Sequence, residues 1–204
     1  MRTVLLVCTG NTCRSPMAEA MLKDMAARAG LSIEVRSAGV GAIDGYPPSP
    51  HAARVLAQRK LPEAGLSRAL NGELVEWADL ILAMTASHKQ AIVQRHPDAV
   101  GKTYTLKEFA MQGDSRMDDV AEAERLYGEM QIRHAMGQRI DEADRERLMA
   151  LQRDLPDFDI ADPFGGSLGM YERSADEIHE ALRRVVELLA GSQGTDRSDA
   201  PGQA

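Results

Sequence analysis

The chain has 204 residues, a length that suits one globular domain with a substantial buried core. Hydrophobic residues make up 44% and charged residues 27%, and the formal net charge of −7 argues against a general nucleic-acid binder. No apolar run reaches membrane-spanning length, and the apolar run at the start is too short for a signal peptide. We therefore expect a cytoplasmic protein that binds neither a membrane nor nucleic acid.

The chain has only two cysteines, Cys8 and Cys13. A secreted disulfide scaffold has more, and their spacing suits no common zinc site. The five histidines are scattered without ligand spacing, so we interpret them as structural or surface residues and expect no metal or other cofactor. Catalysis, redox chemistry and simple burial remain as explanations of the two thiols.

Short runs of leucine and β-branched residues alternate with amphipathic segments along the chain. The runs predict strands at 2–7, 32–38, 79–84 and 102–106, and the amphipathic segments predict helices at 15–29, 50–59, 73–77, 87–95 and 174–189. In the first helix, Ser15 is the expected N-cap and Glu19 lies near the capping-box position. Because strands and helices alternate, we expect an α/β fold with a four-stranded parallel sheet and helices on both faces.

Residues 114–159 differ from the rest because they hold thirteen acidic and seven basic residues, which nearly account for the whole net charge. Their helical spacing predicts a hairpin of two helices with a break at Gly137, inserted into a single domain that spans residues 1–190. A solvated decoration is one interpretation of this insert, and an active-site lid or a partner-docking element is the other. The last residues, 191–204, are rich in small and polar types and predict a disordered tail.

The most informative segment is Cys8-Thr9-Gly10-Asn11-Thr12-Cys13-Arg14-Ser15, which lies between a predicted strand and a predicted helix. A loop in that place directs successive backbone N–H groups to one point, where the helix N-terminus adds positive charge. Gly10 and Asn11 tolerate the unusual backbone angles that such a cradle requires. Arg14 supplies a planar cation matched to phosphate oxygens, and the same field stabilises a thiolate at Cys8. This combination predicts phosphoryl transfer to a cysteine nucleophile.

A carboxyl group that first protonates the leaving group and then deprotonates water completes such a mechanism. Asp154, Asp157, Asp159 and Asp162 are candidates by residue type. Asp162 alone precedes Pro-Phe-Gly-Gly, a rigid turn that could aim it, but a lone aspartate in a loop is more often a turn former.

The run Val-Cys-Thr-Gly-Asn-Thr-Cys-Arg-Ser-Pro-Met-Ala-Glu resembles the signature of low-molecular-weight protein-tyrosine phosphatases. Ser37-Ala38-Gly39 and Asp162-Pro163-Phe164-Gly165 resemble further motifs of that family, in the same order along the chain. The resemblance covers residues 1–112 and 160–190. It implies a four-stranded parallel sheet and a phosphocysteine intermediate at Cys8, with Arg14 as the phosphate clamp and Asp162 as the general acid.

The resemblance also implies roles for the neighbouring residues. The phosphate would be bound by the loop residues Thr9, Gly10, Asn11, Thr12, Cys13 and Arg14. Asn11, Ser15 and Ser37 would support the loop and the thiolate through hydrogen bonds. Cys13 matches a second loop cysteine that can protect the nucleophile as a reversible disulfide.

Three positions depart from the tyrosine-specific pattern. Thr12 stands where a larger apolar residue is usual, Ile43 where a tryptophan is common, and Phe164 is a lone aromatic residue where tyrosines are usual. These features resemble the protein arginine phosphatase branch, and a polar pocket with less aromatic wall suits a guanidinium better than a phenol ring. We therefore expect phosphoarginine on a protein as the substrate, with phosphotyrosine as the alternative.

Two further features weaken the resemblance to the family. Arg68 falls near the position of a supporting histidine in many tyrosine phosphatases of the family, and the insert is not a usual family feature.

An arsenate reductase would need a further redox cysteine besides Cys13. A non-catalytic phospho-residue binding module would need neither Cys8 nor Asp162.

Overall fold

The computed structural model describes the backbone of residues 2–195 and the side chains of residues 2–191. The chain forms two compact units: Met1–Ala110 together with Phe158–Ala204, and Met111–Asp157. The last helix ends at Thr195, so the predicted disordered tail of residues 191–204 was wrong for its first five residues. Residues 196–204 of that prediction lie outside the described residues. Within the described chain, no helix is long and apolar enough to cross a membrane.

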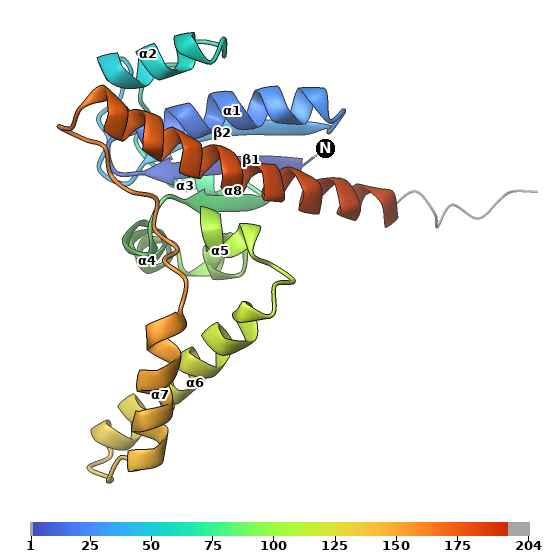
Figure 1. The fold of residues 1–204 in the computed structure, drawn as a ribbon. Helices are drawn as coiled ribbons and strands as arrows, with labels where there is room; N and C mark the ends of the chain where they lie inside the picture. Colours follow the sequence, from blue (N-terminus) through green and yellow to red (C-terminus); the bar gives the residue numbers. More distant parts are fainter. Residues whose placement is uncertain (1, 196–204) are drawn as a thin grey trace, which may run out of the picture. The chain divides into compact units, whose positions relative to one another are not determined.

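The first unit contains the predicted four-stranded parallel sheet (Figure 1). Its strand order is β2-β1-β3-β4. The strands are β1 (Arg2–Cys8), β2 (Ile33–Gly39), β3 (Leu80–Ala83) and β4 (Thr103–Thr105). Val4 of the central strand β1 lies opposite Val35 on one side and Leu80 on the other. Since β1 and β3 are parallel neighbours, the segments that follow Cys8 and Ala83 leave the same edge of the sheet, where ligands of such folds bind.

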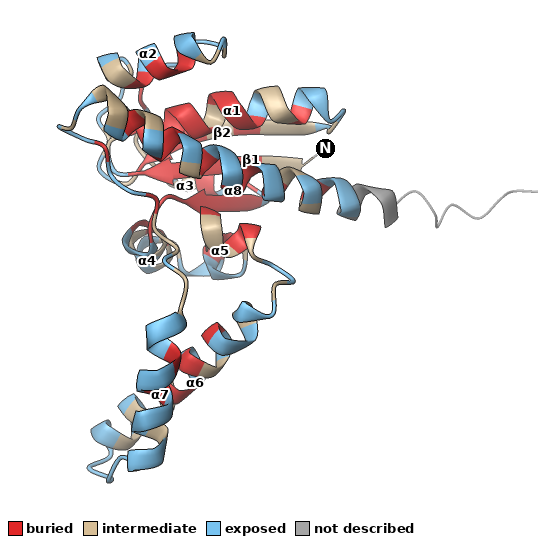
Figure 2. Ribbon diagram, in the orientation of Figure 1, coloured by how far each residue is buried: buried red, intermediate tan, exposed pale blue. Residues whose placement is uncertain are grey.

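Helices cover both faces of the sheet because alternate residues of each buried strand point in opposite directions. Val4 and Leu6 belong to one hydrophobic cluster, to which α1 (Arg14–Arg28), α2 (Pro50–Gln58), α5 (Leu106–Ala110) and α8 (Leu168–Thr195) contribute. Leu5 and Val7 belong to the other cluster, with α3 (Gly72–Trp77), α4 (Ala86–Arg95) and the 3₁₀ helix η1 (Pro97–Lys102). Most of the sheet is red in Figure 2, which marks buried residues, and the tan stretches are partly exposed positions such as the starts of β1 and β2.

Two expectations about local structure need correction. η1 and α5 were not predicted, and the strand predicted at 102–106 is shorter than expected, because Lys102 belongs to η1 and Leu106 begins α5. Ser15 does not cap α1: the N-cap position is Cys13, which makes no side-chain cap hydrogen bond. Ser15 lies inside the first turn instead, where its hydroxyl contacts the sulfur of Cys8.

The second unit contains two helices, α6 (Arg116–Ala135) and α7 (Glu142–Asp154), at the place where the sequence predicts a hairpin. They pack on each other through a small core of their own, formed by Ala123, Leu126, Leu148 and Leu151. Ion pairs link the helices further, with Arg133 to Asp144 at 3.0 Å and Arg147 to Glu122 at 2.6 Å. Gly137, the predicted break, has a φ of 68° and follows the end of α6.

Candidate active site

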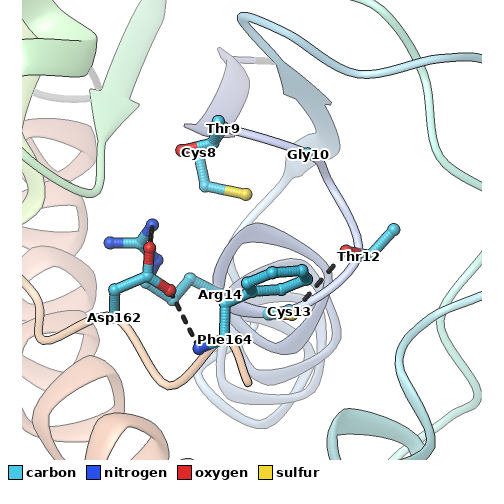
Figure 3. A pocket seen from close by; sticks show the side chains of 8 residues that line it. All are labelled: Cys8, Thr9, Gly10, Thr12, Cys13, Arg14, Asp162 and Phe164. Atoms are coloured by element: carbon cyan, nitrogen blue, oxygen red, sulfur yellow. Dashed lines mark hydrogen bonds and ion pairs between the residues drawn. The ribbon is translucent and has the colours of Figure 1, made fainter. Parts of the chain in front are cut away.

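A cavity of about 210 Å³ lies beside the loop that connects β1 to α1. We call residues 8–14 the cysteine loop. The cavity is lined by Cys8, Thr9, Gly10, Thr12, Cys13, Arg14, Asp162 and Phe164. Figure 3 shows the cysteine loop curving round one side, Asp162 and Phe164 on the other, and the sulfur of Cys8 pointing between them. The structure thus brings together the three residues that the sequence assigned to chemistry.

Cys8 is 3% exposed, and its sulfur lies 3.0 Å from the hydroxyl oxygen of Ser15. The side-chain amide of Asn11 donates to that same oxygen at 2.9 Å and to the hydroxyl of Ser37 at 2.8 Å. Because Ser15 accepts a hydrogen bond from Asn11, its single hydroxyl proton can be donated either to the sulfur of Cys8 or to the carbonyl oxygen of Ala38, which lies 3.4 Å away. A hydroxyl proton aimed at a sulfur stabilises the thiolate form, which is the nucleophilic one.

The backbone of the cysteine loop is held by the chain segments beside it. Asn11 has a φ of 52°, and its side-chain oxygen accepts the backbone N–H of Arg68 at 2.8 Å. Gly39 packs so closely that a Cβ there would lie 2.4 Å from the carbonyl oxygen of Thr9 and 2.9 Å from the backbone nitrogen of Asn11. Only glycine therefore fits at position 39, and Arg68 supports the loop through its main chain.

Arg14 is almost fully buried, and two of its nitrogens have partners. One Nη donates to the carbonyl oxygen of Ile160 at 3.1 Å, and the other pairs with Asp162 at 2.7 Å. The Nε–H has no hydrogen-bond partner among the residues that the structure describes. An unpaired donor on a buried cation is costly, so this group is suited to an anion in the cavity.

The segment that carries Asp162 is fixed at both ends. Ile160 donates its N–H to the carbonyl of Met84 at 2.8 Å, and the Asp159 carboxylate accepts the N–H of Ala86 at 2.7 Å. After Asp162, the N–H of Phe164 donates to its carboxylate at 3.1 Å (dashed in Figure 3), and Gly165 has a φ of 74°.

The other three candidate aspartates do not line the cavity. Asp159 holds the start of α4, while Asp154 ends α7 and Asp157 ends the second unit. Of the four candidates, Asp162 alone lines the cavity.

The second cysteine has a hydrogen-bonded environment that the sequence did not indicate. The sulfur of Cys13 lies 3.3 Å from the hydroxyl of Tyr171 and 3.5 Å from that of Ser49. Burial raises the pKa of Tyr171, and the hydrogen bond to Cys13 raises it further. Both cysteines are free thiols.

His88, which we interpreted from the sequence as a structural or surface residue, contacts the cysteine loop through Thr9. It is buried, and its Nε2 lies 2.8 Å from the hydroxyl oxygen of Thr9. Burial lowers the pKa of His88 to about 4, and the nearby positive charge of Arg14 contributes. A histidine at the third position after a threonine N-cap was the one signal in the sequence, but it says nothing about the partner 79 residues away.

The three residues proposed for specificity are placed differently. Thr12 and Phe164 line the cavity, and Phe164 is 77% exposed. Ile43 is 68% exposed and is not among the residues that line the cavity. Its carbonyl oxygen accepts a hydrogen bond from Ser67 at 2.6 Å, so this position shapes a loop rather than the cavity wall.

The site therefore combines a thiol, an arginine with an unpaired buried donor, and a carboxylate around one small cavity. Within residues 2–195, no group of three or more His, Cys, Asp and Glu side chains is placed to hold a metal ion. These are the groups that a phosphatase with a cysteine nucleophile requires.

Comparison with known proteins agrees with that class. The sequence model described as "Low molecular weight phosphotyrosine protein phosphatase" matches residues 3–157. The chain is 35% identical to the protein-arginine-phosphatase of Bacillus subtilis (strain 168) over 186 residues. The aligned region covers 91% of this chain and 95% of that protein. The chain belongs to the low-molecular-weight phosphotyrosine protein phosphatase family, and it is an enzyme of that class.

Solved structures show the same fold. The YwlE arginine phosphatase from Geobacillus stearothermophilus has a TM-score of 0.69 and 35% identity, covering 95% of this chain and 96% of that one. A YwlE arginine phosphatase mutant with a phosphorylated active-site serine has a TM-score of 0.69 and 34% identity, covering 92% and 95% of the two chains. The family model ends before Asp162, whereas the similarity to these proteins spans more than nine tenths of the chain.

Proposed function

We propose that this protein is a protein-arginine phosphatase that uses Cys8 as its nucleophile. The observation that carries the proposal is the meeting of Cys8, Arg14 and Asp162 around one cavity, in a chain that is similar over nearly its whole length to a protein-arginine-phosphatase. The substrate is a phosphorylated arginine on a protein. The backbone of residues 9–14 and the guanidinium of Arg14 bind its phosphate group.

The reaction proceeds in two steps. The Cys8 thiolate attacks phosphorus and forms an S–P bond, while the N–P bond of phosphoarginine breaks and the leaving guanidine takes a proton from Asp162. Water then attacks phosphorus and gives a proton to Asp162, the S–P bond breaks, and phosphate leaves with the thiolate restored. Asp162 forms an ion pair with Arg14 at 2.7 Å, and this ion pair must break before Asp162 can reach the leaving group.

A proton donor matters more for this leaving group than for a phenol. A guanidine is a far stronger base than a phenolate, so it has to depart protonated. Asp162 is half-exposed at the cavity and is therefore accessible to a substrate.

Thr12 is the residue we propose as the selector between the two substrate classes. It lines the cavity, and its hydroxyl lies 3.6 Å from the sulfur of Cys13. The hydroxyl offers an acceptor to the N–H groups of a guanidinium, and Phe164 is the single aromatic residue among those lining the cavity. Ile43 would act indirectly, through its loop.

The test is a comparison of kcat/KM on two peptides of equal sequence, one with phosphoarginine and one with phosphotyrosine. We expect the phosphoarginine peptide to be preferred. Thr12→Ile should lower that preference by about ten- to a hundredfold, as for the loss of a matched polar contact. A wild-type preference for phosphotyrosine would establish the alternative, a protein-tyrosine phosphatase, which the family description favours.

Three further properties are part of the proposal. Cys8 and Cys13 lie in one short loop, so we propose that an oxidant converts them to a reversible disulfide that protects the nucleophile. A nucleophilic thiol needs a reducing compartment, which suits the cytoplasm. The acidic hairpin of residues 114–159 would dock a protein partner, and the net charge of −7 gives no reason to expect nucleic acid among the partners.

A further inference from the structure

Thr9, the residue after the nucleophile, is held by a side chain from a separate helix. Its hydroxyl oxygen lies 2.8 Å from Nε2 of His88, which belongs to α4. Thr9 lines the cavity next to Cys8 (Figure 3). A buried imidazole therefore contacts the turn that carries the reactive sulfur.

The opposite side of the imidazole is anchored too. Its Nδ1 lies 2.8 Å from the hydroxyl of Thr85, the N-cap residue of α4, whose oxygen also accepts the backbone N–H of His88. A neutral imidazole has one donor and one acceptor nitrogen, and a hydroxyl can serve either. Burial and the charge of Arg14 hold the pKa of His88 near 4 against the opposing charges of Asp162 and Asp159, so the ring is neutral near pH 7.

The main chain of the same turn is fixed from the other direction. The carbonyl oxygen of Thr9 accepts the N–H of Gly41 at 3.0 Å, and that of Cys8 accepts the N–H of Val40 at 2.9 Å. The turn is thus held between residues 40–41 on one side and His88 on the other. A nucleophile has to approach phosphorus in line with the breaking bond, and small misplacements slow such reactions strongly.

We propose that His88 is a positioning residue of this phosphatase, which holds Cys8 in line with the phosphorus atom through the hydroxyl of Thr9. The role rests on the cysteine mechanism proposed above and concerns the alignment of the nucleophile. Phosphate binding itself belongs to Arg14 and to the backbone of the cysteine loop.

Two substitutions of His88 separate the two contacts of the ring. Asparagine ends near the position of Nδ1, so His88→Asn keeps the contact to Thr85 and loses the one to Thr9. Glutamine reaches the position of Nε2, so His88→Gln keeps the contact to Thr9. Thr9→Val removes the hydroxyl without changing the shape of the side chain. His179→Asn, at an exposed position of α8, is the control for loss of a histidine.

The measurement is steady-state kinetics on a small aryl phosphate, with inorganic phosphate as inhibitor. We expect His88→Asn and Thr9→Val each to lower kcat by about five- to tenfold, the range for one lost hydrogen bond. KM and the inhibition constant of phosphate should change by less than about twofold. The double variant should be no slower than either single variant, because both remove the same contact. His88→Gln and His179→Asn should stay near the wild-type rate.

The proposal is overturned if the losses multiply in the double variant, if His88→Gln is as slow as His88→Asn, or if KM alone changes. Should His88→Asn unfold, Thr9→Val decides, and a wild-type kcat in that variant overturns the proposal. A different result tests the phosphatase mechanism itself: turnover that persists in Cys8→Ser contradicts the mechanism, whatever His88 does.

Discussion

Acid should destabilise this protein through His88. In the unfolded chain the imidazole has an ordinary pKa of 6.5, whereas burial and Arg14 lower it to about 4 in the folded protein. The unfolded state therefore takes up a proton in the window from about pH 6.5 to about pH 4, and the folded state does not. Stability contributed by the neutral imidazole is present above that window and is lost as the pH falls through it.

The size of the effect follows from the two pKa values. Between about pH 7 and about pH 5, the difference between the folded and unfolded pKa values of His88 lowers the free energy of unfolding by on the order of 2 kcal/mol. In His88→Gln the side chain does not titrate, while all other ionisable groups remain, Asp159 and Asp162 near the ring included. The free energy of unfolding should therefore fall by about 2 kcal/mol more in the wild type than in the variant.

Urea unfolding of both proteins at the two pH values measures this difference directly. The linear extrapolation gives each free energy of unfolding, and equal m-values show that the comparison is valid. Parallel losses of stability in the wild type and in His88→Gln would refute the reasoning. His88 would then be solvated well enough to protonate in the folded state.

Three other changes probe separate parts of the account. Gly39→Ala places a Cβ 2.4 Å from the carbonyl of Thr9, so we expect kcat/KM to fall at least about tenfold, whereas Gly65→Ala, which meets no atom within 4 Å, should have no effect. Peroxide should inactivate the enzyme, and thiol should restore it with a Cys8–Cys13 disulfide visible by mass spectrometry; equal recovery of Cys13→Ser would remove Cys13 as a protector. Replacing residues 114–156 by a short Gly-Ser linker should preserve turnover of a small aryl phosphate, and an insoluble product would mean that the hairpin is needed for folding.

The sequence was sufficient for the sheet and for the main chemical groups because these depend on local patterns. The buried run of β1, the turn at Gly10 and Asn11, and the helix after Arg14 are adjacent in the chain, so their order predicts an anion-binding loop. The hairpin helices were predictable for the same reason, since α6 and α7 each carry a helical period.

The rest depends on contacts between distant residues. His88 lies 79 residues from Thr9, and Tyr171 lies 158 residues from Cys13, so no local pattern reports either pair. Ser15 shows how a local pattern misleads. Glu19 lies near the capping-box position for a Ser15 N-cap, but the hydroxyl of Ser15 contacts Cys8, and Glu19 accepts a hydrogen bond from Ser37.

A covalent phosphocysteine is the central claim, and trapping it is the most direct measurement. Asp162→Ala retains the nucleophile and Arg14 but lacks the group that activates water, so the intermediate should accumulate. With an aryl phosphate, whose leaving group departs without help, rapid acid quench and peptide mass spectrometry should find one phosphoryl group on Cys8. The same treatment of Cys13→Ser/Asp162→Ala should give the same result. Phosphate on another residue, or sustained turnover in Cys8→Ser, would contradict the account.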